Sequence, residues 1–99
     1  MTLPSGTFDG TIHGYLKPLG KLWTGKTFTG DTVINHIAGR KLIEGDVRRE
    51  GDEVIIHYPR LGLTDRLTDL FGDGSRWAGV MELGRWTIRF TLTRPRERR

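Results

Sequence analysis

From residue 20 onward the chain alternates apolar and polar residues, which is the pattern of a strand with one buried face. The alternation is clearest near the end of the chain, where one face carries Trp86, Ile88, Phe90 and Leu92. The pattern predicts strands at 21–29, 31–37, 41–49, 53–58, 76–83 and 85–93, joined by short hairpins.

Two stretches fit more than one element. Residues 61–71 fit a strand or a short helix with Thr64 as its N-cap. Residues 7–19 fit a strand that places Phe8, Ile12 and Leu16 on one face, or a helix capped by Ser5 or Thr7. We favour a short helix in this second stretch, although its glycines and Pro18 oppose one.

The whole pattern gives about seven short strands and no crossover helix, so the fold class is mainly β. An antiparallel meander of this size removes its unpaired edges by closing into a small barrel. A half-open barrel with the N-terminal helix plugging one end is the alternative. The barrel is expected to occupy residues 1–93 as a single domain.

Composition narrows the classes of function. Residues 94–99 contain four arginines and one glutamate, which is +3 of the net charge of +4 and leaves +1 for residues 1–93. We therefore predict a basic, disordered tail and no nucleic-acid face on the barrel. No apolar run reaches the ~18 residues of a membrane span, so no membrane partner is expected. The absence of cysteine and of a signal-peptide pattern favours a cytoplasmic protein.

Asp65 is the main candidate for chemistry, because it shares a strand face with Leu61, Leu63 and Leu67. A carboxylate on a buried face needs a partner or a function, and in a barrel lumen it could serve as an acid/base or a ligand anchor. The alternative is an aspartate that bonds backbone amides at a bend or pairs with Arg66 or Arg40.

Tyr58 and Lys26 are the next candidates. Tyr58 shares a face with Val54 and Ile56, so its hydroxyl is expected to point inward, toward a ligand or Asp65, unless it is a hydrated tyrosine at the edge of the core. Lys26 is either a buried anchor beside Trp23 or a solvated lysine at a strand end.

Aromatic and apolar side chains complete the predicted ligand site. Trp23 and Trp77 would line an apolar pocket, although indoles serve equally well to fill a small core. The pocket is expected to add Leu63, Met81 and Phe90. Three histidines, at 13, 36 and 57, have no spacing typical of metal ligands, so neither a metal nor a cofactor is expected.

Four short motifs resemble the GXWXG-type family and its partner domain of unknown function. They are Trp23-Thr24-Gly25-Lys26-Thr27-Phe28, Tyr58 to Leu67, Gly79 to Gly84 and the closing strand Phe90 to Arg94. The chain departs from the family at Lys21, Pro59 and Gly62. The resemblance implies a lipocalin-like (calycin-like) β-barrel and supplies no reaction.

The sequence therefore supports three hypotheses. The first is a barrel that binds an apolar or aromatic small molecule, and the second is a small barrel enzyme (isomerase, cyclase or lyase) in which Asp65 and Tyr58 are catalytic. The third is a homodimeric interaction module, in which a second subunit covers an exposed strand edge and an aromatic patch.

Overall fold

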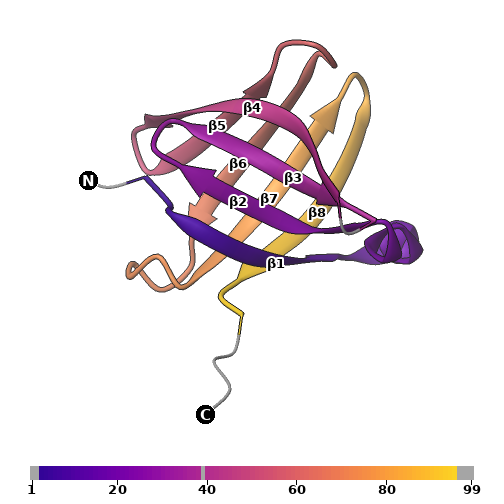
Figure 1. Cartoon of the computed structure of the whole chain (residues 1–99), viewed down its shortest axis with the longest axis horizontal. Coiled ribbons are helices and arrows are strands. Elements are labelled where there is room, and N and C mark those ends of the chain that lie inside the picture. Colours follow the sequence, from indigo (N-terminus) through magenta and orange to yellow (C-terminus); the bar gives the residue numbers. More distant parts are fainter. Residues whose placement is uncertain (1–2, 39, 96–99) are drawn as a thin grey trace.

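The computed structural model describes residues 3–38 and 40–95, and within them it is an eight-stranded antiparallel barrel (Figure 1). Consecutive strands are hydrogen-bonded neighbours, and β8 returns to pair with β1. The strands are β1 (Gly6–Ile12), β2 (Trp23–Thr29), β3 (Thr32–Ile37), β4 (Arg40–Glu50), β5 (Glu53–Tyr58), β6 (Leu63–Asp69), β7 (Arg76–Leu83) and β8 (Trp86–Thr93). The predicted barrel is confirmed, with eight strands in place of about seven.

The extra strand comes from the stretch where we favoured a helix. β1 ends at Ile12, and a 3₁₀ helix, η1 (Gly14–Lys21), follows it. Gly14, the first residue of η1, has φ 85°. The short helix expected in residues 7–19 is thus present as η1 in the second part of the stretch, whereas residues 6–12 form a strand, because the apolar residues of the stretch belong to two consecutive elements. The helical alternative for 61–71 is wrong, since Leu63–Asp69 pairs with both β5 and β7.

Closure of the barrel removes the strand edge that the homodimer hypothesis required. Residues 9–12 of β1 pair with residues 90–93 of β8, so among the described strands each has two hydrogen-bonded neighbours. A closed barrel offers no unpaired ladder to a second subunit. That part of the hypothesis is wrong.

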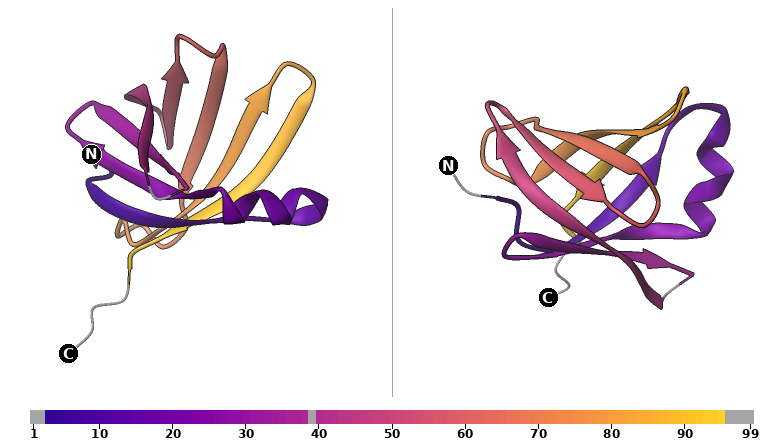
Figure 2. Two further views of the ribbon diagram at one scale, coloured as in Figure 1. Left: turned by 45° about the vertical axis from the view of Figure 1, so that its right-hand side comes forward. Right: turned by 90° about the horizontal axis from the view of Figure 1, so that it is seen from above.

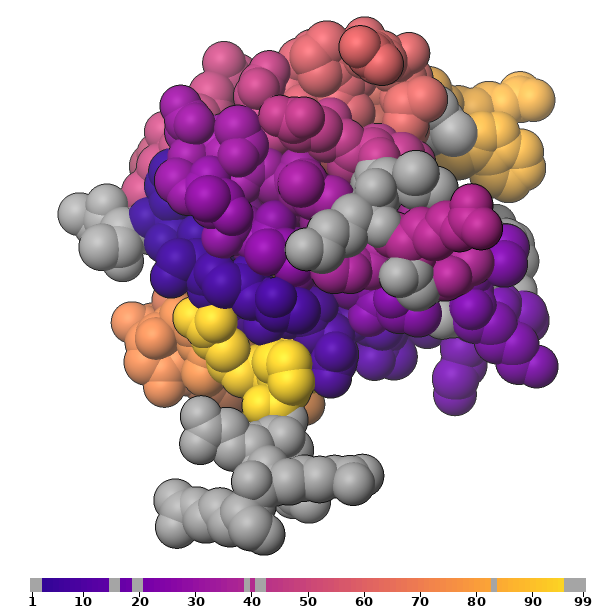
Figure 3. All heavy atoms as spheres, in the orientation of Figure 1, coloured from indigo at the N-terminus to yellow at the C-terminus, as the bar shows by residue number. Residues whose placement is uncertain are grey.

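The barrel has two unlike ends (Figure 2). At the mouth end lie η1 and the β3–β4, β5–β6 and β7–β8 turns. At the filled end lie the other three connections, at 30–31, 51–52 and 70–75, together with residues 3–5 and 94–95, near the two ends of the described chain. Arg94 N donates to Ser75 O there, and Figure 3 shows the end of β8 against the β6–β7 loop.

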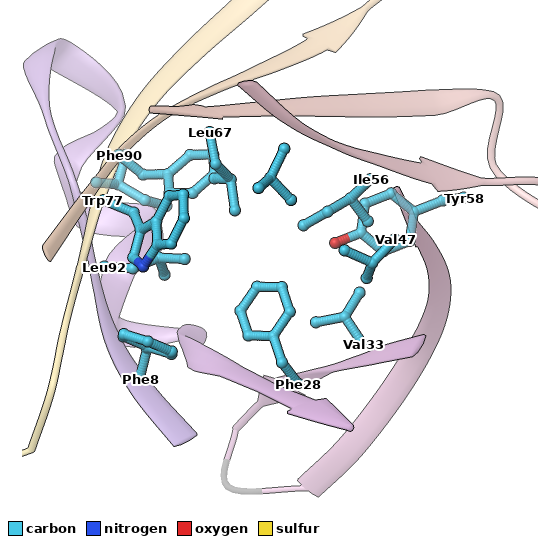
Figure 4. Close-up of a cluster of buried hydrophobic side chains, with 12 residues drawn as sticks. Phe8, Phe28, Val33, Val47, Ile56, Tyr58, Leu67, Trp77, Phe90 and Leu92 are labelled. Atoms are coloured by element: carbon cyan, nitrogen blue, oxygen red, sulfur yellow. The ribbon is translucent and has the colours of Figure 1, made fainter. Parts of the chain in front are cut away.

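Apolar side chains pack the filled end. The inward residues of the alternating strands form one buried cluster, shown in Figure 4. Phe8 and Phe28 meet edge to face at 5.8 Å, and Trp77 is buried with its Nε1 donating to Gly74 O. Each fully buried side chain of this kind contributes about 1.5–3 kcal/mol. Within the barrel, a cavity remains on the mouth side of this cluster.

Candidate ligand cavity and its polar floor

A cavity of about 270 Å³ opens at the mouth end. All eight strands contribute side chains to its wall, and Leu22, just before β2, and Leu61, in the β5–β6 turn, complete it. The lining residues are Ile12, Leu22, Trp23, Asn35, Ile37, Ile43, Tyr58, Leu61, Leu63, Met81, Ile88 and Phe90. Ten of these twelve are apolar or indole side chains, so the wall suits an apolar ligand.

Most of the predicted pocket residues line this cavity. Trp23, Leu63, Met81 and Phe90 do so, as does Tyr58. Lys26 and Asp65 do not line it and lie behind its floor. Trp77 lies in the core of the filled end, so the structure separates it from the others.

Lys26 is buried and fully hydrogen-bonded, which rules out the solvated alternative. Its side chain is 0% exposed, and its Nζ lies 2.9 Å from Asp65 Oδ2. The same ammonium donates to Asn35 Oδ1 at 2.5 Å and to the Tyr58 hydroxyl at 2.7 Å. An ammonium has three protons to donate, so each proton has an acceptor.

The Lys26–Asp65 pair spans the barrel. β2 and β6 are four strands apart in a closed order of eight, so they form opposite walls. The pair thus crosses the lumen between the packed cluster and the cavity. The predicted burial of Asp65 is confirmed, and its ion-pair partner is Lys26. Arg66 points outward to Glu82 and Glu53 at 2.8 and 3.5 Å, Arg40 is exposed in the β3–β4 turn region, and Asp65 lies within β6 and not at a bend, so the alternatives are wrong.

Tyr58 joins the two charges to Asn35. Its hydroxyl accepts from Lys26 and from Asn35 Nδ2 (3.0 Å) and donates to Asp65 Oδ2 (3.0 Å). The inward direction predicted for Tyr58 is confirmed. Asn35 Nδ2 also donates to Ile43 O, and Asn35 Oδ1 accepts from Trp23 Nε1 at 2.9 Å. Every polar group on the cavity wall is therefore engaged within the protein.

Burial governs the electrostatics of this network. Desolvation lowers the pKa of Lys26 below its usual 10.5, and the negative charge of Asp65 opposes that shift. Desolvation also raises the pKa of Tyr58 above its usual 10, and the neighbouring carboxylate raises it further. Tyr58 is therefore a neutral hydrogen-bond donor at physiological pH. Oδ1 of Asp65 has no hydrogen-bond partner among the described residues.

Three aromatic rings enclose the ammonium. The ring centroids of Trp23, Tyr58 and Phe90 lie 5.2, 5.2 and 5.5 Å from Lys26 Nζ, within the range of cation–π attraction. The same rings face the cavity, so they separate the charge from any ligand.

Each of these rings lies against a glycine. A Cβ added at Gly10 would come within 2.4 Å of the Trp23 ring, at Gly45 within 2.6 Å of Tyr58, and at Gly79 within 2.3 Å of Phe90. Glycine is required at these positions by close packing of the ring on the neighbouring strand.

A bulge in β4 shapes the rim of the cavity. Ile34 pairs with Glu44 and Asn35 with Leu42, which leaves Ile43 as the extra residue. Ile43 has φ 62°, a conformation rare for a β-branched residue. The bulge lets the Ile43 carbonyl accept from Asn35 while its side chain lines the cavity.

Sequence reasoning missed Asn35 and Ile43. The inward position of Asn35 could have been predicted, because it lies two residues from both Val33 and Ile37 and therefore shares a strand face with them. The position of Ile43 could not, since nothing in the local sequence indicates the bulge.

The remaining sequence candidates lie apart from the cavity. His13 is hydrogen-bonded to Thr91 and His36 to Thr27, each at 2.6 Å, and His57 is exposed. In residues 3–38 and 40–95 no three acidic or histidine side chains are close enough to hold a metal ion.

No helix in this part of the chain is long and apolar enough to cross a membrane. Of the tail predicted at 94–99, Arg94 donates its backbone N–H to Ser75 O and lies over the Phe8 ring, and residues 96–99 lie outside the described residues.

Comparisons with known protein families, curated proteins and solved structures find no match to this chain. The resemblance to the GXWXG-type family therefore stays a prediction.

Proposed function

We propose that the barrel binds a small apolar molecule in the cavity at its mouth end. The observation that carries the proposal is a largely apolar wall on which the polar groups of Trp23, Asn35 and Tyr58 are all engaged within the protein. A ligand gains by displacing water that this wall cannot bond well. The volume matches about nine water molecules, which corresponds to an alkyl chain of on the order of ten carbons.

The same geometry supports binding over catalysis. A general acid or base must come within hydrogen-bond reach of the reacting atom. Asp65 and Lys26 do not line the cavity, and Tyr58 is the one titratable side chain among its described lining residues. An isomerase, cyclase or lyase reaction would require the floor to open.

The test is calorimetric titration with 1-decanol, a neutral probe of suitable size. Met81→Trp should fill the cavity and weaken decanol binding by about tenfold or more, since the ligand and the indole compete for the same space. Leu70→Trp, at an exposed position of the filled end, is the matched control and should leave the affinity unchanged. Equal affinity in both folded variants, or no binding to the unmodified protein, would refute the proposal.

A further inference from the structure

The connections at the two ends of the barrel carry opposite charge. The mouth segments, which are residues 14–22, 38–40, 59–62 and 84–85, contain no Asp or Glu. Their described cations are exposed and make no ion pair with a described residue; they are Lys17, Lys21, Arg40, Arg60 and Arg85. The connections of the filled end at 30–31, 51–52 and 70–75 contain Asp31, Asp52 and Asp73 and no Lys or Arg. Cations on or next to the neighbouring strands lie beside these connections, namely Arg48, Arg49, Arg76 and Arg94, so the absence of cations holds for the connections themselves.

Two of the cations adjoin the rim of the cavity. Lys21 precedes Leu22 and Arg60 precedes Leu61, and both leucines line the cavity while being about half exposed. A charged group held at the rim would therefore lie near an ammonium and a guanidinium. Because charges at a partly dehydrated rim are less screened than in open water, such proximity favours an anion.

The floor of the cavity cannot hold that anion. Asn35 Nδ2 already donates twice, the Tyr58 hydroxyl donates to Asp65, and the indole N–H of Trp23 donates to Asn35. An acid group at the floor would lose its hydration without gaining a donor. A polar head must therefore stay at the mouth.

We propose that the ligand is an anionic amphiphile, with its alkyl chain in the cavity and its acid group at the rim beside Lys21 and Arg60. This inference rests on the proposed function and adds the chemical class of the ligand. The acid group should lie away from β4, since a second hollow beside the mouth contains Glu44 and Asp46 together with Arg60.

The test compares three ligands with one chain length: decanoate, 1-decanol and decyltrimethylammonium. Calorimetry at about pH 8, where the carboxylate is ionised, is run at about 20 mM and about 500 mM NaCl. At low salt decanoate should bind about tenfold more tightly than decyltrimethylammonium, and high salt should remove most of the difference.

Charge-reversal variants test whether Lys21 and Arg60 produce the preference for the anionic ligand. Lys21→Glu/Arg60→Glu should abolish or invert the preference, while decanol affinity is unchanged. Arg48→Glu/Arg76→Glu makes the same change in net charge on exposed positions of β4 and β7 toward the filled end, and should keep the preference. An equal loss in both double variants, or no preference in the unmodified protein, would overturn the inference. Decanol binding without such a preference leaves the proposed function standing, whereas no binding of any of the three refutes both.

A vesicle experiment identifies the source of the acid group. Sedimentation with phosphatidylglycerol vesicles but not with phosphatidylcholine vesicles, lost in Lys21→Glu/Arg60→Glu, would support the inference with a lipid as the ligand. Decanoate binding without sedimentation would support it with a free carboxylate.

Discussion

Lys26 and Asp65 form an ion pair in which both side chains are 0% exposed. Removing two charges from water costs several kcal/mol per ion, and the pair recovers this only through close geometry and further hydrogen bonds. Asn35 and Tyr58 supply those bonds on one side, and the aromatic rings supply cation–π attraction. The pair is therefore sensitive to the loss of either partner.

We predict that Lys26→Met lowers the free energy of unfolding by about 3–5 kcal/mol, because it leaves the Asp65 carboxylate buried and unpaired. The double variant Lys26→Met/Asp65→Leu should be less destabilised than the single one, since no isolated charge remains. Urea unfolding measures both.

The exposed pair Arg48–Glu50 provides the control. Its side chains are largely in solvent, so Arg48→Met should change stability by less than about 1 kcal/mol. Equal effects of Lys26→Met and Arg48→Met would contradict the account of the buried pair.

The raised pKa of Tyr58 predicts how the stability of the protein depends on pH. Its pKa is raised in the folded protein, so the stability it contributes is complete below about pH 10, the pKa of an exposed tyrosine, and is lost as the pH rises above that value. The stability difference between the unmodified protein and Tyr58→Phe should shrink by about 1 kcal/mol between about pH 10 and pH 11.

Lys26 changes the pH dependence of stability in the opposite direction, and it does so at pH values below its usual pKa of 10.5. Its pKa is lowered, so its contribution to stability increases with pH up to about 10.5, and it does so in both proteins. Urea unfolding at several pH values separates the two effects. A difference that stays constant from about pH 8 to about pH 11 would show that Tyr58 ionises normally in the fold.

At the scale of the element, the β4 bulge combines strain with a place in the cavity wall. A left-handed conformation costs about 1–2 kcal/mol for a residue with a side chain. At Ile43 this cost coincides with an inward carbonyl that bonds Asn35 and a side chain at the cavity rim. Strain of this kind persists where the surrounding structure enforces it.

We predict that Ile43→Asn is more stable than Ile43→Ala by about 1 kcal/mol, because asparagine tolerates the left-handed region and alanine does not. Both variants lose the apolar side chain, so both should bind decanol more weakly than the unmodified protein. Thermal unfolding and calorimetry test the two statements, and an alanine variant as stable as the asparagine variant would show that no strain is stored there.

Strands could be predicted from the sequence where the spacing of apolar residues followed a single period over the whole element. β8 alternates strictly, and Val54, Ile56 and Tyr58 share one face of β5, so the inward positions of Tyr58 and Phe90 followed from the sequence. The region of β1 and η1 failed because its apolar residues belong to two elements with different periods. The partner of Asp65 could not be predicted either, because Lys26 lies 39 residues away on the opposite wall and meets Asp65 only once the barrel closes.

At the scale of the whole molecule, the charge of the barrel is small in sum and separated in space. The value of +1 for residues 1–93 gave no reason to predict a basic surface, because a sum counts the cations of the mouth against the acids of the filled end. The topology places the two groups apart, since alternate connections of an antiparallel meander lie at opposite ends of the barrel. The group of cations at the mouth, from which we infer the ligand class, could therefore not be predicted from the net charge.

The position of Leu3 and Arg94, near the two ends of the described chain, has a practical consequence. Leu3 and Arg94 lie at the filled end, around a shared hollow with the β6–β7 loop, so a linker joined to either side of the described chain departs away from the mouth. The protein can thus be attached to a sensor surface through a linker or tag fixed at the filled end, beside Leu3 or Arg94, while its cavity faces the sample.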